Sequence, residues 1–381
     1  MNILYYSWGE NSKDDFINAT KTLGHGINLI FAPSQNHLNN PTLENFICEA
    51  ALNCKPDYIF TFNYLPIISQ AAMRVGIPYI SWVYDCPHWT LYSPTITNPV
   101  NRVFLFDLTM VDMVKTLGCT HTYHLPLATN FHKHNYSIGN DGYKCKISFV
   151  GNLYENNPLN QVQYMPAELM GFLDGIKDAQ KQIWGYDLIQ ELLTPELISQ
   201  IGSYIKYDNN SLCPLPDNNL FLSILQKKLT SEERISSINH LSDISEVTLY
   251  TTSNALLCPN ATYKGTVSYT QEMPQVFANS EINLNITLRS IASGIPLRAI
   301  DIMGCGGFLL SNYQPELDMF FENNVDYVAF YNESDLLAKA DYYLSHPNER
   351  KKIAQNGLMK VKANFSYENQ LAKMFSTLIQ L

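Results

Sequence analysis

Short apolar runs alternate with longer amphipathic segments along the first third of the chain. The apolar runs predict strands over residues 2–8, 26–32, 57–62, 78–84, 102–107 and 120–127. The segments between them predict helices over residues 12–24, 42–54, 66–76 and 108–118. Strands that alternate with helices of about ten residues are typical of βαβ units, so we expect a parallel sheet.

The pattern resumes after residues 132–145, which are polar and contain glycine, as in a linker. Residues 158–241 have a mostly helical pattern, which we interpret as an insertion. Further strands are predicted over residues 146–154, 246–251, 265–270, 282–287, 308–310 and 326–331. Further helices are predicted over residues 271–280, 296–303, 334–346, 347–365 and 366–380.

The expected architecture is therefore α/β, with two Rossmann-like, doubly wound domains over residues 1–135 and 145–365. Residues 366–381 form a terminal helix that crosses back. Two consecutive α/β domains of this kind predict a ligand cleft between them.

Composition and charge argue against several classes of protein. The 381 residues carry a formal net charge of -10, which argues against a nucleic-acid binder held by phosphate contacts. No apolar run reaches the roughly 18 residues of a membrane span, and the N-terminus lacks the basic start of a signal peptide. The eight scattered cysteines include no C-x2-C pair and are typical of free thiols. We expect a cytoplasmic protein without bound metal, and peripheral membrane contact stays open.

Candidate chemistry lies in the loops that follow strands, because ligands of open parallel sheets bind outside the carboxyl ends of the strands. The first such loop contains Gly9 but lacks the pattern G-x-G-x-x-G, which argues against a nicotinamide dehydrogenase. Gly9 either lets a ligand approach the backbone or makes a simple turn.

The loop "YDCPHWTLYSP" places Asp85 directly after the fourth apolar run. Asp85 and His88 are candidates for a general base and its orienting group, and Trp89 is a candidate platform for a sugar ring or a lipid-like acceptor. Asn63 lies at the end of the preceding strand. The alternatives are that Asp85 caps a turn and that His88 is merely exposed.

In the second domain, "FVGNLYENNP" follows a strand in the same way. Gly151 lets a backbone approach a pyrophosphate closely, and the main-chain amides beside it are candidate donors. Asn152 and Tyr154 are candidate ligand contacts in the same turn. The alternative is a plain turn between a strand and a helix.

"NLNITLRSIASGIPLR" holds Asn285, Thr287, Arg289 and Arg298, all of them candidate donor contacts. Arginine binds phosphate oxygens in a bidentate manner, and a helix N-terminus adds unpaired amides. Asp301 follows Arg298 at spacing i, i+3 and is a candidate acceptor for ribose hydroxyls. The alternatives are a surface salt bridge for either arginine and, for Asp301, a pair with Arg298.

The run "SGIPLRAIDIMGCGGFLLSNYQPEL", with "ERKKIAQNG" and "NFSYENQLAKMF" downstream, resembles the CgeB-like (spore maturation protein B-like) glycosyltransferases. The segments "SYTQEMPQVFANSEINLNIT" and "ISWVYDCPHWTLYS" are also similar to parts of such proteins. The resemblance implies a GT-B enzyme that moves a sugar from a nucleotide-sugar to an acceptor. It implies that the second domain binds the nucleotide, that the first binds the acceptor, and that neither metal nor cofactor is required.

Two positions depart from the family pattern. A glutamate that relatives carry eight positions before Asp301 is replaced by Ser293, and Asn156 and Asn157 stand where relatives often have a basic residue. The resemblance then leaves the phosphate charge to Arg289, Arg298 or Lys264.

Several alternatives stay open at this stage. They are a catalytically silent glycan- or nucleotide-sugar-binding protein, a GT-B-like sugar-nucleotide epimerase, and a phosphorylase. The donor nucleotide is UDP-, GDP- or dTDP-linked, and the acceptor is a glycan, a protein, a lipid carrier or a small molecule. Inversion needs a base such as Asp85, whereas retention does not.

Overall fold

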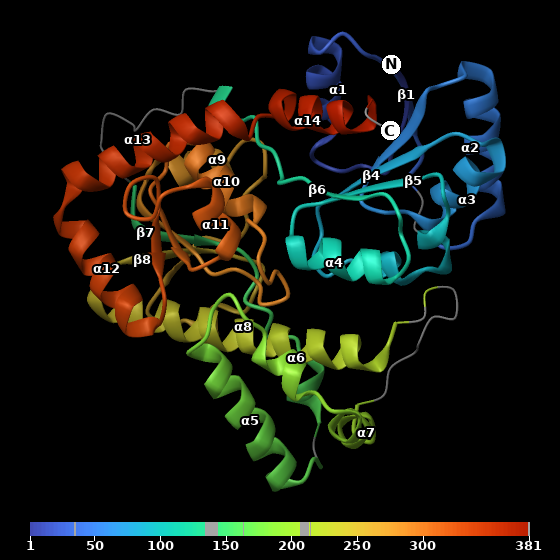
Figure 1. The fold of residues 1–381 in the computed structure, drawn as a ribbon. Coiled ribbons are helices and arrows are strands. Elements are labelled where there is room, and N and C mark those ends of the chain that lie inside the picture. Colours follow the sequence, from blue (N-terminus) through green and yellow to red (C-terminus); the bar gives the residue numbers. More distant parts are fainter. Residues whose placement is uncertain (34–35, 134–143, 163, 206–212, 214, 380–381) are drawn as a thin grey trace. The chain divides into compact units, whose positions relative to one another are not determined.

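The computed structural model of the chain describes residues 1–33, 36–133, 144–162, 164–205, 213 and 215–379. The chain divides into two compact units, which are described separately (Figure 1). The first unit comprises Met1–Ala128, Asp208–Leu215 and Asn364–Leu381, and the second comprises Thr129–Tyr207 and Pro216–Ala363. Most of the predicted linker, and with it the predicted domain limit at residue 135, lies outside the described residues. The predicted terminal helix belongs to the first unit.

The first unit is built on a six-stranded sheet in the order β2-β1-β3-β4-β5-β6, with every neighbouring pair parallel. Its strands are β1 (Asn2–Ser7), β2 (Gly26–Phe31), β3 (Tyr58–Phe62), β4 (Tyr79–Val83), β5 (Asn101–Leu105) and β6 (Thr122–His124). Its helices are α1 (Lys13–Thr22), α2 (Pro41–Cys54), α3 (Pro66–Val75), α4 (Leu108–Thr116) and α14 (Tyr367–Ile379). The C-terminal helix α14 packs against α1, and Leu371 and Met374 enter the core of this sheet (Figure 1).

Local capping chemistry explains where these helices begin. Asp107 caps α4, because its Oδ1 accepts hydrogen bonds from the amides of Thr109 at 2.8 Å and Met110 at 3.2 Å. Helix α2 is capped by Asn40, and Pro41 occupies its first position, so it begins earlier than the pattern predicted.

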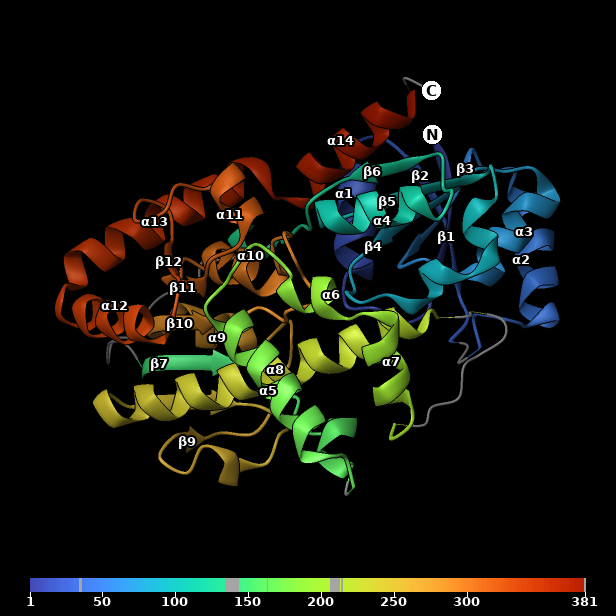
Figure 2. The same cartoon turned by 60° about the horizontal axis from the view of Figure 1, so that its bottom comes forward.

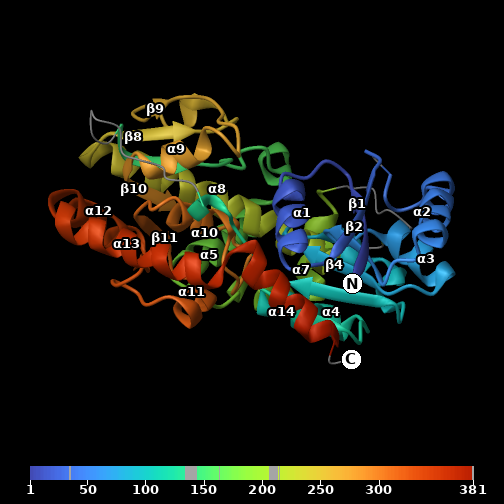
Figure 3. The ribbon, with the colours of Figure 1, turned by 90° about the horizontal axis from the view of Figure 1, so that it is seen from above.

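The second unit contains another six-stranded parallel sheet, in the order β12-β11-β10-β7-β8-β9, with β9 at one edge (Figure 3). Its strands are β7 (Cys145–Val150), β8 (Val247–Tyr250), β9 (Thr262–Tyr263), β10 (Ser280–Asn285), β11 (Leu309–Asn312) and β12 (Val328–Phe330). Its flanking helices are α9 (Met273–Ala278), α10 (Leu297–Gly304), α11 (Pro315–Phe320), α12 (Glu333–Ser345) and α13 (Pro347–Asn364).

The strand predicted over residues 265–270 is wrong. Gly265 has a φ of +75° and turns the chain away from β9. The Ser268 amide then donates to the Glu272 carboxylate, while the Glu272 amide donates back to the Ser268 hydroxyl. This reciprocal bonding closes a turn between Ser268 and Glu272, the residue directly before α9, so the segment is a turn and not a strand.

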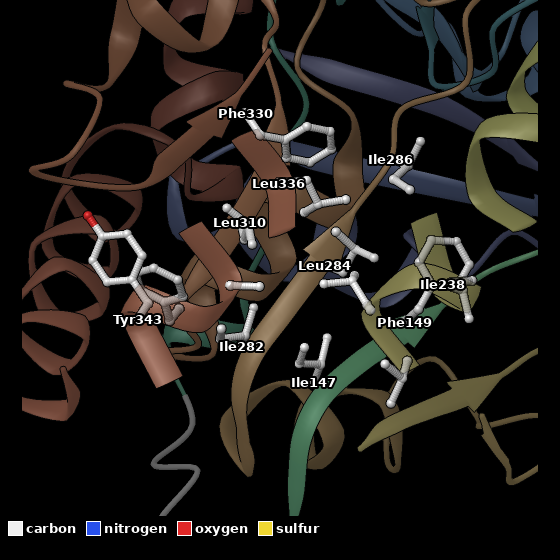
Figure 4. Packing of buried hydrophobic residues seen from close by; sticks show 14 of the residues in the cluster. Ile147, Phe149, Ile238, Ile282, Leu284, Ile286, Leu310, Phe330, Leu336 and Tyr343 are labelled. Atoms are coloured by element: carbon white, nitrogen blue, oxygen red, sulfur yellow. The ribbon is translucent and has the colours of Figure 1, made fainter. Parts of the chain in front are cut away.

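The segment predicted as a helical insertion holds four α-helices among its described residues. They are α5 (Ala167–Lys181), α6 (Leu188–Leu192), α7 (Pro195–Gly202) and α8 (Asp217–Ile244), and α8 passes beside the other three (Figure 2). The first half of α8 joins an insertion core through Leu225 and Leu229. Its second half joins the sheet core through Ile238 and Leu241 (Figure 4). One helix therefore fixes the insertion to the sheet.

Among the described residues, no helix is both long and apolar enough to span a membrane.

Candidate functional site

The turn after β7 lies directly against an arginine of α10. A Cβ atom on Gly151 would lie 3.0 Å from Nη2 of Arg298, which is tighter than nine in ten Cβ contacts in proteins. The glycine is therefore what allows the guanidinium to rest on the backbone of this turn. The Gly151 amide donates to the carbonyl oxygen of Tyr250 at 2.9 Å, which fixes the turn to β8.

Arg298 forms no ion pair with any residue that the structure describes. Among the residues that the structure describes, its guanidinium makes no hydrogen bond or ion pair, and its Nε is buried without a partner. Burial lowers the pKa of Arg298, although Tyr154 and Asp301 nearby oppose that shift. Arginine stays protonated in proteins, so the first turn of α10 carries a partly buried cation. Such a group is costly unless an anion pairs with it.

A second arginine, Arg234 of α8, lies behind the same turn. It is buried and donates through Nη1 to the carbonyl oxygen of Asn152, and through Nε to that of Ile286 at 3.1 Å. Burial and the like charge of Arg298 lower its pKa to about 10. Arg234 thereby joins the ends of β7 and β10 and adds positive charge at the turn.

Sequence reasoning missed Arg234. The residue lies within a long helical pattern, where an arginine is usually solvent-exposed, and no local signal marks it as buried.

The other two candidate residues of the turn after β7, Asn152 and Tyr154, make contacts that hold the turn in its conformation. The Asn152 Oδ1 accepts the Tyr154 amide at 2.5 Å, and Tyr154 has a left-handed φ of +57°. The centre of its ring lies 4.9 Å from the Arg234 guanidinium, which is close enough for a cation–π contact. The turn is thus preorganised around two cations.

Asn285 and Thr287, at the end of β10, are buried and bonded within the fold. Asn285 Nδ2 donates to Thr287 Oγ1 at 3.1 Å and to Ser311 Oγ at 2.9 Å. The Thr287 amide donates to Asn312 Oδ1 at 2.7 Å. The structure therefore places both residues as supports of the strand end.

Arg289 differs from Arg298 in having a hydrogen-bond partner for each of its three guanidinium nitrogens. Its Nε donates to Glu233 Oε2 at 3.0 Å, its Nη2 bonds the other carboxylate oxygen, and its Nη1 donates to the Ile183 carbonyl at 2.7 Å. The guanidinium carbon lies 3.3 Å from the centre of the Trp184 ring. Burial raises the pKa of Glu233, and the charge of Arg289 opposes this. Arg289 is thus neutralised within the fold.

Asp301 lies on α10 one turn after Arg298, and it is 1% exposed. Its Oδ2 accepts a hydrogen bond from the hydroxyl of Tyr269 at 3.1 Å. Ser293 donates from Oγ to Glu316 Oε1 at 2.7 Å, and both side chains are buried. A carboxylate is therefore present behind Ser293.

In the first unit, Asn63 holds Asp85 at the ends of β3 and β4. Asn63 has a left-handed φ of +60° and is 5% exposed. Its Nδ2 donates to Asp85 Oδ2 at 2.7 Å, and its Oδ1 accepts the amides of Tyr84 at 2.9 Å and Asp85 at 3.2 Å. Asp85 itself is exposed. The sheet therefore presents a fixed, accessible carboxylate.

His88 and Trp89 follow in the same loop. His88 Nε2 lies 3.1 Å from the Tyr64 amide, which ties the loop to the chain just after β3, and 2.7 Å from the Thr90 hydroxyl within the loop. Burial lowers the pKa of His88, against the attraction of Asp85. Trp89 begins the one-turn 3-10 helix η1 (Trp89–Tyr92) and is partly buried.

Gly9 lies in a loop that Glu10 organises. The Glu10 carboxylate accepts the amides of Trp8 at 3.0 Å and Gly9 at 3.1 Å, and it also binds the Tyr5 hydroxyl. Burial raises the pKa of Glu10. Sequence reasoning singled out the glycine of this loop and missed the acid.

The chain was compared with protein families, curated proteins and solved structures. Residues 235–376 match the family described as Glycosyl transferase-like. No curated protein matches the chain. Solved structures that resemble the whole chain include Anabaena Alr3699/HepE in complex with UDP-glucose, with 10% identity, 100% of both chains covered and a TM-score of 0.57.

Two more solved structures resemble the chain. Sucrose-phosphate synthase from Thermosynechococcus elongatus has 10% identity and a TM-score of 0.54, over 100% of this chain and 98% of that one. AviGT4, a glycosyltransferase involved in avilamycin A biosynthesis, has 8% identity and a TM-score of 0.52, over 99% and 96%. At these identities the likeness shows the fold, which is the GT-B fold of two Rossmann-like domains. The family match over residues 235–376 and this fold together support a glycosyltransferase.

Proposed function

We propose that the chain transfers a sugar from a nucleotide-sugar donor to an acceptor hydroxyl, without a metal ion or other cofactor, and that it is CgeB-like. The observation that carries the proposal is the unpaired guanidinium of Arg298, resting on the Gly151 turn with the charge of Arg234 behind it. A diphosphate is the anion that a GT-B nucleotide-sugar enzyme must hold, and Alr3699/HepE, which shares the fold, is described in complex with UDP-glucose.

In this proposal the second unit holds the donor. Arg298 and main-chain amides at the start of α10 bind the diphosphate, and Arg234 supports them electrostatically. Asp301 accepts ribose hydroxyls beside its bond from Tyr269. The bond between the anomeric carbon and the diphosphate oxygen breaks with its electron pair going to the diphosphate. The guanidinium charge stabilises that leaving group in the role that a metal ion has elsewhere.

The acceptor side is assigned to the first unit. In an inverting reaction the acceptor oxygen bonds to the anomeric carbon, and its proton passes to the exposed carboxylate of Asp85. Asn63 supports this by holding that carboxylate in place. Gly9 and Trp89 are proposed to contact the acceptor, and His88 to orient the loop.

A non-catalytic nucleotide-sugar-binding protein is the second candidate. It is favoured by Ser293, whose hydroxyl is already bonded to the buried Glu316. Both candidates bind a nucleotide-sugar, but only the transferase releases the nucleoside diphosphate from it.

The test is incubation with UDP-, GDP- and dTDP-linked sugars, with and without EDTA, followed by detection of released nucleoside diphosphate. Release that persists in EDTA and is lost in Arg298→Ala supports the metal-independent transferase. The matched control is Arg74→Ala, which removes an exposed arginine of α3. Binding without release favours the non-catalytic candidate, and the absence of both overturns the proposal.

A further inference from the structure

A cavity of about 230 Å³ lies within the second unit, between the helical insertion and the loop that joins β12 to α12. Gln182 and Trp184 line it from the segment between α5 and α6, and Ser236 and Ser237 line it from α8. Its volume is several times the roughly 30 Å³ of one water molecule and below the roughly 300–1,000 Å³ of sites for drug-sized ligands. The cavity therefore suits a ligand of about one ring.

One wall of the cavity is formed by the ends of two parallel strands. Ile286 directly follows β10 and Phe330 is the last residue of β12, and Figure 4 shows both side chains at one end of the sheet core. Open parallel sheets bind their ligands at the carboxyl ends of the strands. The Ile286 carbonyl accepts the Nε–H of Arg234 at 3.1 Å, and Arg234 also binds the Asn152 carbonyl. Arg234 thereby connects this wall to the turn after β7.

Several polar groups of the lining have no partner in the part of the chain that the structure describes. Ser237 is 6% exposed, and its hydroxyl makes no hydrogen bond to a described residue. The same holds for the side-chain amide of Gln182 and the indole N–H of Trp184. Glu333 accepts the Ser236 hydroxyl at 2.7 Å through Oε1, which leaves Oε2 as a further acceptor. The cavity thus offers both donors and acceptors, which suits hydroxyl groups because they both donate and accept.

The charges that line the cavity are paired within the fold. Lys181 Nζ lies 3.1 Å from Glu232 Oε2, and Glu233 is neutralised by Arg289. The same Arg289 guanidinium stacks on the Trp184 ring, which fixes the indole in place. Among its described residues the lining therefore has no unpaired cation to meet a phosphate group, and it suits a neutral ligand.

We propose that this cavity binds one neutral sugar ring. The choice of a sugar among neutral polar ligands rests on the proposed function, whereas the size, the charge and the hydrogen-bonding groups are those of the cavity itself. The ring is either the glycosyl group of the donor or a sugar separate from the donor, and the two sources are distinguished by experiment.

The test combines two binding measurements on the whole chain. NMR titration uses free glucose, galactose, mannose and N-acetylglucosamine, and calorimetry compares UDP-glucose with UDP, GDP-mannose with GDP and dTDP-glucose with dTDP. Ser237→Leu fills the cavity from α8, and Gln182→Ala removes an exposed amide from its lining. Ser237→Leu is expected to weaken sugar binding at least about tenfold, the loss of roughly one good contact, and Gln182→Ala about threefold.

The matched control is Gln190→Ala, which changes an exposed glutamine of α6 outside the cavity. It is expected to change neither measurement. Thermal unfolding shows whether each variant folds, and Gln182→Ala, at an exposed position, decides the test if Ser237→Leu does not fold.

A loss in Ser237→Leu for a nucleotide-sugar but not for its parent nucleotide would identify the ring as the glycosyl group of the donor. A loss confined to a free sugar would identify a sugar separate from the donor. Equal losses for nucleotide-sugar and nucleotide, or unchanged binding in both variants, would overturn the sugar site. If the wild-type chain binds free sugar but neither nucleotides nor nucleotide-sugars, the proposed function is overturned instead, and the absence of all binding would overturn both.

Discussion

Gly151 and Arg298, 147 positions apart in the sequence, lie side by side: a Cβ atom on Gly151 would be within 3.0–3.2 Å of three guanidinium atoms of Arg298. The contact joins the end of β7 to the first turn of α10. A Cβ atom at position 151 would lie 3.0 Å from the guanidinium, so the glycine leaves room for the arginine at this position.

We predict that Gly151→Ala weakens nucleoside diphosphate binding about five- to tenfold, because the added methyl group displaces the guanidinium from the turn. Calorimetric titration with the nucleotide that binds the wild-type chain measures this. Gly171→Ala, at a helical position where an added Cβ meets nothing within 4 Å, is the control. Wild-type affinity in Gly151→Ala would contradict the proposed geometry.

Arg298→Ala and Arg289→Ala are predicted to have opposite signatures. Arg298 has no partner to lose, so its removal should cost about 1.5–3 kcal/mol of nucleotide binding and leave the free energy of unfolding unchanged or higher. Removal of Arg289 leaves the buried Glu233 carboxylate uncompensated and should destabilise the fold by about 3–5 kcal/mol. Denaturant unfolding and calorimetry separate the two effects. The reverse pattern would assign the phosphate role to Arg289.

Asp301→Ala is predicted to weaken nucleotide binding by about 1.5–3 kcal/mol, the usual range for a hydrogen bond to a charged group. Comparison of a nucleoside diphosphate with inorganic pyrophosphate checks the assignment to ribose, because pyrophosphate lacks that group. A loss that is equal for both ligands would argue against a ribose contact.

Asp85→Asn is predicted to leave nucleotide affinity unchanged and to slow transfer at least about 100-fold, the lower end of the range for general base catalysis. Asn63→Ala should slow transfer to a smaller extent, since it frees a carboxylate that is otherwise held at 2.7 Å. Release of nucleoside diphosphate under saturating donor is the measurement. Normal turnover of Asp85→Asn would rule that residue out as the base.

The stability of the first unit is predicted to fall as the pH drops below about 6.5. Burial lowers the pKa of His88 from its ordinary value of 6.5, so the unfolded chain binds a proton more readily than the folded one. Stability from this group is complete above pH 6.5 and is lost as the pH falls toward the folded pKa. Thermal unfolding at pH 5 and pH 7 tests this, and His88→Gln should flatten the difference. An unchanged pH dependence in the variant would contradict it.

The sequence alone determined the alternation of strands and helices in this protein. Apolar runs and helical spacing are local properties, so they located the parallel strands, the helical insertion and the loops that follow strands. They also placed Arg298 and Asp301 on one face of α10 and marked Gly151 as a point of close approach. One error was local as well: residues 265–270 have strand-like composition, but a glycine turn and the reciprocal hydrogen bonds between Ser268 and Glu272 lead them into α9.

Only the tertiary structure distinguished one arginine from another. In the sequence Arg289 and Arg298 look equivalent and Arg234 looks like a surface residue, because a guanidinium has the same chemistry wherever it occurs. Partners from distant segments decide its role: Glu233 neutralises Arg289, while the guanidinium of Arg298 lies beside Gly151 with no ion pair among the described residues. The burial and pairing of an arginine depend on contacts between distant segments, and such contacts produce no periodic pattern in the sequence.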